Sequence, residues 1–350
     1  MNDNSDKVIL AGGSGFLGRL LAPWFGRRDR EVVVLARSPQ VVAGAVRGVV
    51  WDGATLAEWW KELNGAAAVI NLAGRSVNCR YHARNRRAIL DSRLNSTRVI
   101  GAAIGRCDRP PPVWLNSSTA TIYKHSFDQP MDEATGIIAG TREAKDEFSI
   151  EVATAWERTF EEARTPATRK VAMRTAMVLG LEPATVFRVL RRLTHLGLGG
   201  KLGSGRQYVS WIHEHDFCRA VELLIEPADL SGPVNLAAPH PLPNREMMQI
   251  LRQVCGVLFG LPAARWMLEV GAFFLRTETE LILKSRRVVP RRLLAAGFEF
   301  EFPDFRAAAT ELEQRLRCIA AGPVQLENSS LPCAAAQRAA RGGDLMEKRP

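Results

Sequence analysis

The sequence predicts an α/β fold: a doubly wound parallel sheet with a small substrate lobe and an appended C-terminal module. Three observations predict it. Short apolar runs alternate with stretches of helical apolar spacing in the first half of the 350-residue chain. A glycine-rich turn directly follows the first apolar run, and prolines punctuate a helical region after residue 238. With 46% hydrophobic and 24% charged residues, the composition also excludes global disorder.

Buried strands are expected where an apolar run is bounded by glycine, proline or polar residues. In the first half these runs are Val8 to Ala11, Val32 to Leu35, Val69 to Leu72, Val113 to Asn116 and Val171 to Met173. Apolar residues recur at helical spacing between them, as in Phe16 to Arg27 and Arg84 to Ile104. Val234 to Ala237 is expected as a later strand of the same sheet. Such alternation predicts parallel strands with helices on both faces.

The chain is expected to divide into three parts. Residues 7–238 form the core, with the lobe mainly at 181–232. Residues 239–310 form the module, with helical stretches at Asn244 to Phe259 and Ala264 to Phe274. Residues 320–350 are rich in Ala, Arg, Gly and Ser without apolar periodicity, which predicts a disordered tail.

The strongest motif is the turn after the first strand, Gly12-Gly13-Ser14-Gly15-Phe16-Leu17-Gly18. Gly12 permits a tight turn out of the strand, and Gly15 lets a pyrophosphate approach the backbone. Gly18 lets the following helix pack close to the sheet, with the helix N-terminus directed at the phosphates. This strand–turn–helix context predicts a dinucleotide site.

Arg37 follows the second expected strand, in Val34-Leu35-Ala36-Arg37-Ser38. An NAD-selective site usually places Asp or Glu there, to bind the ribose hydroxyls. The guanidinium of Arg37 can instead pair with a 2′-phosphate. The sequence therefore favours NADP over NAD as the cofactor; the alternative is that Arg37 is one of many surface arginines.

Further segments carry a family resemblance. Ile70-Asn71-Leu72-Ala73-Gly74 and Asn116 to Tyr123 accompany the glycine turn, and Ser92-Arg93-Leu94 and Trp156-Glu157 narrow the match. The remaining matching segments are Gly197 to Gly205, Ser210-Trp211-Ile212-His213, Gly232 to Pro239, and Val289-Pro290 through Gly297-Phe298. Together, over residues 7–310, they resemble the extended short-chain dehydrogenase/reductases, and within them the atypical, YfcH-like epimerase family with its own small C-terminal domain.

The resemblance implies a Rossmann core and a set of cofactor residues. Beyond the glycine turn, these are Ala36, Arg37, Leu72, Ala73, Arg93 and Val178. The implied function is an NADP-dependent oxidoreductase or nucleotide-sugar-epimerase-like enzyme. Its expected partner is a small-molecule substrate that the sequence does not identify, with a homodimer as a possible assembly.

The acid–base motif of that superfamily, Tyr-x-x-x-Lys, is absent from the sequence; Ser149 and Ala153 stand at its positions. In one hypothesis Thr119 and Tyr123 supply catalytic hydroxyls, and Glu133, Glu143 or His213 completes the site. Thr119, Tyr123 and His213 each also have a plain structural interpretation: a strand-end residue, a packing aromatic and a structural His–Asp contact. In the other hypothesis the chain binds NADP(H) without redox turnover, as a regulatory or scaffold protein.

The net charge of +10 suggests an acidic partner, and the cofactor is the simplest one. The basic run Tyr81 to Arg87 lacks further stacking aromatics, so nucleic acid is not expected. No signal peptide is expected, because Asp3 and Asp6 stand where a signal peptide has its basic region. No membrane span is expected either, since no uncharged apolar run is long enough. Six cysteines without a Cys-x-x-Cys pair predict reduced thiols, a cytoplasmic location and no metal site.

Overall fold

The structure is a computed structural model that describes residues 6–38, 46–183, 185–226, 230–274 and 278–321. Of the predicted tail, only the first two residues are described, and they are helical; the rest lies outside the described residues.

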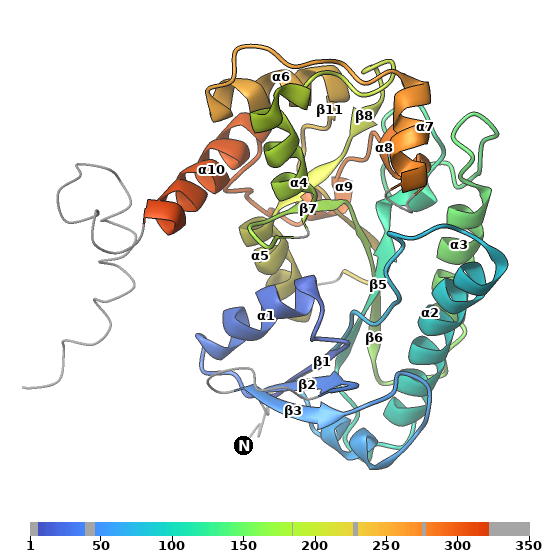
Figure 1. Ribbon diagram of the computed structural model, residues 1–350. Coiled ribbons are helices and arrows are strands. Elements are labelled where there is room, and N and C mark those ends of the chain that lie inside the picture. The colour runs from blue at the N-terminus through green and yellow to red at the C-terminus, as the bar shows by residue number, and fades with distance from the viewer. Residues whose placement is uncertain (1–5, 39–45, 184, 227–229, 275–277, 322–350) are drawn as a thin grey trace, which may run out of the picture.

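A seven-stranded parallel sheet forms the centre of the molecule, in the order β10-β6-β5-β4-β1-β2-β3 (Figure 1). Its strands are β1 (Val8–Ala11), β2 (Val32–Ala36), β3 (Val46–Val50), β4 (Ala68–Asn71), β5 (Val113–Thr119), β6 (Arg169–Thr175) and β10 (Gly232–Leu236). The doubly wound fold is thus confirmed. The strand order reverses at β1, which pairs with β2 on one side and β4 on the other. In open α/β sheets, ligands bind at such a switch point, outside the carboxyl ends of the strands.

β3 is the strand of the seven-stranded sheet that the sequence did not predict. It contains Gly48 and forms the edge of the sheet, where β2 is its one neighbour among the described strands. Its residues are half-buried or exposed, so they do not form the continuous apolar run of a central strand. Arg47 on this strand pairs with Glu62 at 2.6 Å.

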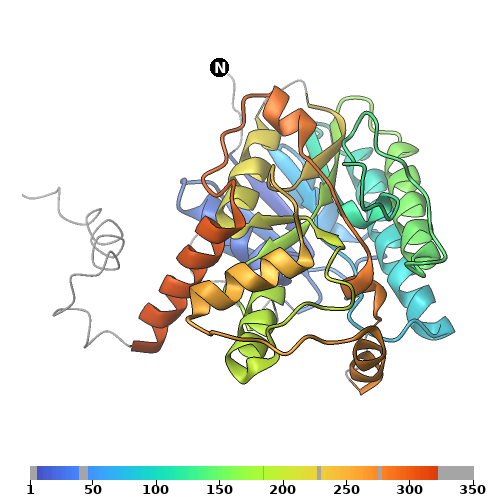
Figure 2. The ribbon, with the colours of Figure 1, turned by 90° about the horizontal axis from the view of Figure 1, so that it is seen from above.

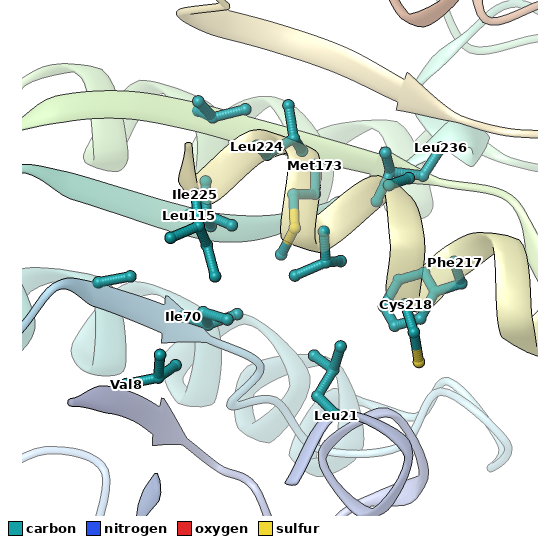
Figure 3. Close-up of a cluster of buried hydrophobic side chains, with 14 of the residues drawn as sticks. Val8, Leu21, Ile70, Leu115, Met173, Phe217, Cys218, Leu224, Ile225 and Leu236 are labelled. Atoms are coloured by element: carbon teal, nitrogen blue, oxygen red, sulfur yellow. The ribbon is translucent and has the colours of Figure 1, made fainter. Parts of the chain in front are cut away.

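Helices cover both faces of the sheet. α1 (Phe16–Gly26) and α5 (Glu214–Ile225) lie on one face, and α2 (Ala83–Ile104) and α3 (Glu147–Glu161) on the other (Figure 1). Figure 3 shows the core of the first face, where Leu21 and Phe217 meet strand residues such as Ile70 and Met173. α5 falls within the range predicted for the lobe, yet it belongs to this covering layer.

Most of the remaining elements, all later than residue 175, build the upper part of the molecule in Figure 1. Two small sheets pair β7 (Met177–Leu179) with β9 (Trp211–His213) and β8 (Tyr208–Val209) with β11 (Leu242–Pro243). The helices are α4 (Val186–Leu193), α6 (Asn244–Cys255), α7 (Arg265–Phe274), α8 (Glu280–Leu283), α9 (Arg291–Ala295) and α10 (Phe305–Ala321). α6 ends four residues earlier than predicted, because Gly256 adopts a left-handed conformation at φ +73° and caps it.

The lobe and the C-terminal module share one core. Phe187 of α4 and Trp211 of β9 are buried together with Met248 of α6 and Leu312 of α10. The Trp211 and Phe305 rings are 5.5 Å apart in an edge-to-face arrangement. Figure 2 shows α10 beside α6 at the side of the molecule.

Two further expectations concern cysteines and membranes. Cys79, Cys107, Cys218 and Cys255 are free, as predicted, but the prediction is wrong for Cys318, which is disulfide-bonded.

Within the described part of the chain, no helix combines the length and the apolar character that a bilayer span requires.

Candidate functional site

A cavity of about 580 Å³ lies where β1, β2, β3 and β4 end, at the switch point of the sheet. Seven residues predicted to bind a cofactor line it together: Gly12, Ser14, Gly15, Ala36, Arg37, Leu72 and Ala73. The other lining residues are Leu35, Trp51, Asp52, Gly53, Ala54, Gly74, Arg75, Ser76, Ala88, Ser92 and Asn95. Residues from four strand ends and from α2 therefore converge on one site.

The glycine turn has little room for side chains on its protein side. Gly12 has φ +76°, and a Cβ there would lie 2.7 Å from the Ala73 Cα. A Cβ on Gly18 would overlap the backbone of Gly13, so this glycine lets α1 pack against the turn. A Cβ on Gly15, in contrast, would meet only the Gly12 carbonyl oxygen, at 3.6 Å. The open space at Gly15 thus faces the cavity.

Gly15 is also the N-cap of α1 and has no side chain to bind the first-turn N–H groups. These groups have no intrahelical partner and carry the positive end of the helix dipole. An anion such as a pyrophosphate would satisfy them. Phe16 and Leu17 pack partly buried against the core, and a side chain on Gly180 would meet the Phe16 ring.

A buried amide network fixes the loop after β4. The Asn71 Oδ1 atom accepts the Ala73 N–H at 3.1 Å, and its Nδ2 atom donates to Asn116 Oδ1 at 2.7 Å. The Thr97 hydroxyl contacts Asn116 and accepts the Trp156 indole N–H at 3.0 Å. Asn71, Thr97 and Asn116 are at most 1% exposed. The network holds Leu72 and Ala73 at the cavity wall and explains why the Asn-x-Ala-Gly pattern follows β4.

The adenosine end of the cavity combines predicted and unpredicted residues. Arg37 is exposed and lines the cavity directly after the end of β2. Trp51 and Asp52 follow β3 and were missed, because the strand that places them was not predicted. Asp52 Oδ1 accepts the N–H groups of Ala54 and Thr55, both at 2.8 Å, and hydrogen bonding by Thr55 and Ala54 lowers the Asp52 pKa. The available signal was an acidic residue and a glycine directly after a Val-rich run.

Arg93 and Val178 do not line the cavity. Arg93 lies behind its wall, where Nη1 donates to the carbonyl oxygens of Arg75 and Ile89 at 3.1 and 2.9 Å. Its guanidinium lies 5.1 Å from the Trp156 ring, and burial lowers its pKa to about 10. Val178 is buried against the core beneath α5. A direct cofactor contact for either residue stays a prediction.

The two hydroxyls predicted as catalytic occupy different environments. Thr119 is half-buried at the end of β5, where its Oγ1 accepts the Thr121 N–H at 3.1 Å. Tyr123 is 2% exposed; its hydroxyl donates to Asn235 Oδ1 and accepts from Arg174, both at 2.9 Å. Burial raises the Tyr123 pKa. This geometry favours a structural role for Tyr123, and the catalytic roles of Thr119 and Tyr123 stay predictions.

The candidate acids and bases are dispersed. Glu133 accepts the Asn235 N–H at 2.8 Å, and Glu143 is exposed. His213 caps α5 and contacts Glu311 at 3.0 Å through Nε2. Of the residues at the Tyr-x-x-x-Lys positions, Ala153 is buried among apolar neighbours, and Ser149 donates to Glu280 at 2.9 Å.

A group of three potential metal ligands, His195, Cys255 and Glu313, lies at the edge of the shared core of lobe and module, with His195 exposed and the other two buried. Glu313 is ion-paired with Arg191 and with Arg317. Burial raises the Cys255 pKa to about 11, which disfavours the thiolate that binds metals. The chemistry of this donor set gives no argument for a cation.

Comparisons with known proteins agree with the geometry. Residues 8–237 match the family model described as the NAD dependent epimerase/dehydratase family, and residues 263–312 match a domain of unknown function (DUF1731). The chain is 31% identical over 314 residues to the epimerase family protein SDR39U1 of Bos taurus, covering 87% of this chain and 99% of that protein. It is 27% identical over 315 residues to the epimerase family protein YfhF of Bacillus subtilis, covering 87% and 97%.

Among solved structures, a similar one is the crystal structure of the human epimerase family protein SDR39U1 with NADPH. Its TM-score is 0.76 at 28% identity, with 88% of this chain and 99% of that chain covered. The similarity therefore extends over the sheet, the lobe and the C-terminal module.

Proposed function

Because the chain belongs to the NAD dependent epimerase/dehydratase family, we propose that its cavity binds NADP(H). We further propose that it is an oxidoreductase or epimerase-like enzyme acting on a small molecule with a carbonyl or secondary hydroxyl group. One observation carries this proposal. The space at Gly15 is open beside the first turn of α1, whose N–H groups have no side-chain cap, and the same cavity extends to Arg37.

The residues present fit each part of the dinucleotide. The first-turn N–H groups of α1 and the Gly15 backbone suit the pyrophosphate. Arg37 suits a 2′-phosphate, because its guanidinium offers paired donors at the end of β2. Supporting this preference, the human relative was crystallised with NADPH. When bound, the nicotinamide supplies hydride chemistry, and the chain's own residues have to orient the substrate and move a proton.

A fluorescence titration with NADPH and NADH tests cofactor binding. Losing a charged hydrogen-bonding partner removes ~1.5–3 kcal/mol, so Arg37→Ala should weaken NADPH binding by ~10- to 100-fold and leave NADH nearly unchanged. Arg27→Ala is the matched control, since Arg27 lies at the far end of α1 from the glycine turn. Full NADPH preference in Arg37→Ala would contradict the assignment of the 2′-phosphate site.

A second function, NADP(H) binding without turnover, is favoured by one observation. Ser149 and Ala153 cannot act as the Tyr and Lys of the superfamily, and Ala153 is fully buried. A screen of ketones, quinones and sugar nucleotides against bound NADPH separates the two functions. Tight NADPH binding with no oxidation across the screen would support the regulatory function.

A further inference from the structure

Two adjoining loops expose an apolar surface on the upper part of the molecule. One is the connection between α6 and α7, which runs over the top in Figure 1. Its Leu258 and Phe259 are 97% and 72% exposed, and Leu261 is exposed as well. The other is the turn Thr194–Leu198 after α4, where Leu196 is exposed. A group of apolar side chains left in water is typical of a surface that binds a partner.

The two loops are held together through their backbones. The Leu261 N–H donates to the Gly197 carbonyl oxygen at 2.8 Å, and the Gly200 N–H donates to the Leu261 carbonyl oxygen at 3.2 Å. A Cβ on Gly200 would lie 2.4 Å from the Leu261 backbone, and a Cβ on Gly260 would lie 2.5 Å from the Gly199 backbone. Because the backbones touch at these glycines, no side chain fits between the loops there. The apolar surface is therefore a fixed feature of the fold.

A cavity of about 840 Å³ adjoins these loops, and Gly260 and Pro262 of the connection line part of it. Four cationic side chains line it as well: Lys201, Arg245, Arg252 and Arg306. Glu246 is the single acidic residue of the lining. The cavity thus places an excess of positive charge beside the apolar surface.

None of these four cations forms an ion pair within the described part of the chain. Arg252 donates to the Gly199 carbonyl oxygen, and Arg306 donates to the Gln253 Oε1 atom, both at 2.6 Å. Both acceptors are neutral, so no carboxylate balances the charges of the two guanidinium groups. The cavity therefore keeps its positive charge for a partner.

Gly205 places the other two cations side by side. It has φ +70°, and a Cβ there would lie 3.0 Å from the Cβ atoms of both Lys201 and Arg245. Both of these side chains are exposed. Neighbouring like charges repel each other, and a bound anion removes this repulsion. The pair therefore suits an anionic group such as a phosphate.

We propose that this surface binds the face of an anionic phospholipid bilayer. Leu258 and Phe259 enter the acyl boundary, while Lys201 and Arg245 bind phosphates at the level of the headgroups. A bilayer presents phosphates and hydrocarbon in adjacent layers, and peripheral proteins bind both with apolar side chains next to Lys and Arg. The exposed Trp266 at the start of α7 suits the same interface, where tryptophan is enriched. The inference goes beyond the proposed function and does not depend on cofactor binding.

Three other occupants fit the surface less well. A second copy in a symmetric dimer would bring two cationic cavities to one interface, where they would repel each other. The chain's own residues 322–350 contain four basic and three acidic residues, so they offer no excess of negative charge. An acidic protein would supply the charge, but it would also need an apolar pocket for Leu258 and Phe259.

Vesicle co-sedimentation of the full chain tests the proposal. The protein should bind phosphatidylcholine vesicles that contain phosphatidylglycerol, and its binding to pure phosphatidylcholine should be at least ~10-fold weaker. Raised salt should release the protein from the anionic vesicles. Equal binding to both kinds of vesicle, or binding to neither, would overturn the proposal.

Replacing Leu258 and Phe259 together by serine tests the apolar contact. This double variant should bind anionic vesicles at least ~10-fold more weakly, because two side chains no longer enter the acyl boundary. Val50→Ser combined with Leu294→Ser is the matched control, since both side chains are exposed on other parts of the surface, in β3 and α9. The control should keep wild-type binding. Undiminished vesicle binding without Leu258 and Phe259 would overturn the proposal.

Lys201→Gln combined with Arg245→Gln tests the phosphate contact. A cation near an anionic surface contributes ~5-fold to binding, so this variant should bind anionic vesicles ~10- to 30-fold more weakly. Arg27→Gln combined with Arg106→Gln removes the same charge from two exposed positions elsewhere and should bind nearly as the wild type does. An equal loss in both double variants would mean diffuse attraction by the net charge and would overturn the proposal.

Three further measurements complete the test. Urea unfolding of the variants at the two loops should match the wild type, because the replaced side chains are exposed. Self-association that Phe259→Ser abolishes, without any vesicle binding, would assign the surface to a second copy and overturn the proposal. Binding to polyglutamate but not to anionic vesicles would assign it to an acidic protein, with the same consequence.

Discussion

Replacing Lys284 by methionine should destabilise the fold strongly. Lys284 and Asp146 form an ion pair at 2.6 Å, and both side chains are 0% exposed. Lys284 also donates to the Thr121 carbonyl oxygen at 2.6 Å. The pair joins the start of α3 to the C-terminal module, and burial lowers the Lys284 pKa. Met preserves much of the aliphatic stem but leaves the Asp146 carboxylate buried without its cation.

The magnitude follows from the partners that Asp146 keeps. Removing one member of a buried ion pair costs ~3–5 kcal/mol. Asp146 still accepts the Thr141 N–H at 2.6 Å, and it stands at the N-terminus of α3, where the helix dipole favours an anion. We therefore expect the lower end, a loss of ~3 kcal/mol in the free energy of unfolding. Asp146→Asn combined with Lys284→Met should recover ~2 kcal/mol of it, since no charge remains buried.

Urea unfolding at neutral pH measures these values, with an unchanged m-value showing that compactness is preserved. Lys145→Met is the matched control: Lys145 is the exposed neighbour of Asp146, and its replacement should change stability by less than ~0.5 kcal/mol. A loss below ~1 kcal/mol in Lys284→Met would refute the reasoning. A double variant whose loss equals the sum of the two single losses would refute it as well.

Three more predictions use glycines and pH. Gly15→Ala should fold with nearly wild-type stability but bind NADPH at least ~10-fold more weakly, because its methyl group enters the cavity. Fluorescence titration measures the affinity, and an affinity equal to that of the wild type would contradict the phosphate site. Gly18→Ala should lose ~1–3 kcal/mol in urea unfolding, since its Cβ overlaps the Gly13 backbone, and wild-type stability would contradict that contact. Because the folded-state pKa of Glu280 is raised, its contribution to stability is full below the unfolded pKa and is lost as pH rises through the folded one. Glu280→Gln should therefore gain stability relative to wild type as pH rises from about 4 toward neutrality, and a constant difference between the two would argue against a raised pKa.

The fold and the phosphate turn could be predicted because their signals are local in the sequence. Apolar runs and glycine spacing fix β1, the turn and α1 within a stretch of consecutive residues. β3 was not predicted, because an edge strand lacks a continuous apolar run, and the cavity residues that follow it, Trp51 and Asp52, were missed for the same reason. Tyr123 was selected by resemblance, but its burial and its hydrogen bonds to Asn235 and Arg174 arise only from tertiary packing.

The hydrogen bond between Ser149 and Glu280 could not be predicted for a related reason. Ser149 and Glu280 are 131 residues apart, and no periodicity or spacing connects them. The sequence shows that position 149 lacks the tyrosine of the motif, but only the folded chain shows that a carboxyl group of the C-terminal module lies beside it.

The shared core of lobe and module bears on how this chain can be divided. The matched family segment 263–312 begins after α6, yet α6 and α10 bury Phe187 and Trp211 of the preceding region. A fragment that ends near residue 238 would expose these aromatic side chains to water, and an isolated C-terminal segment would expose the opposite surface. Chimaeras between relatives should therefore exchange the lobe and the module together, because each covers apolar side chains of the other.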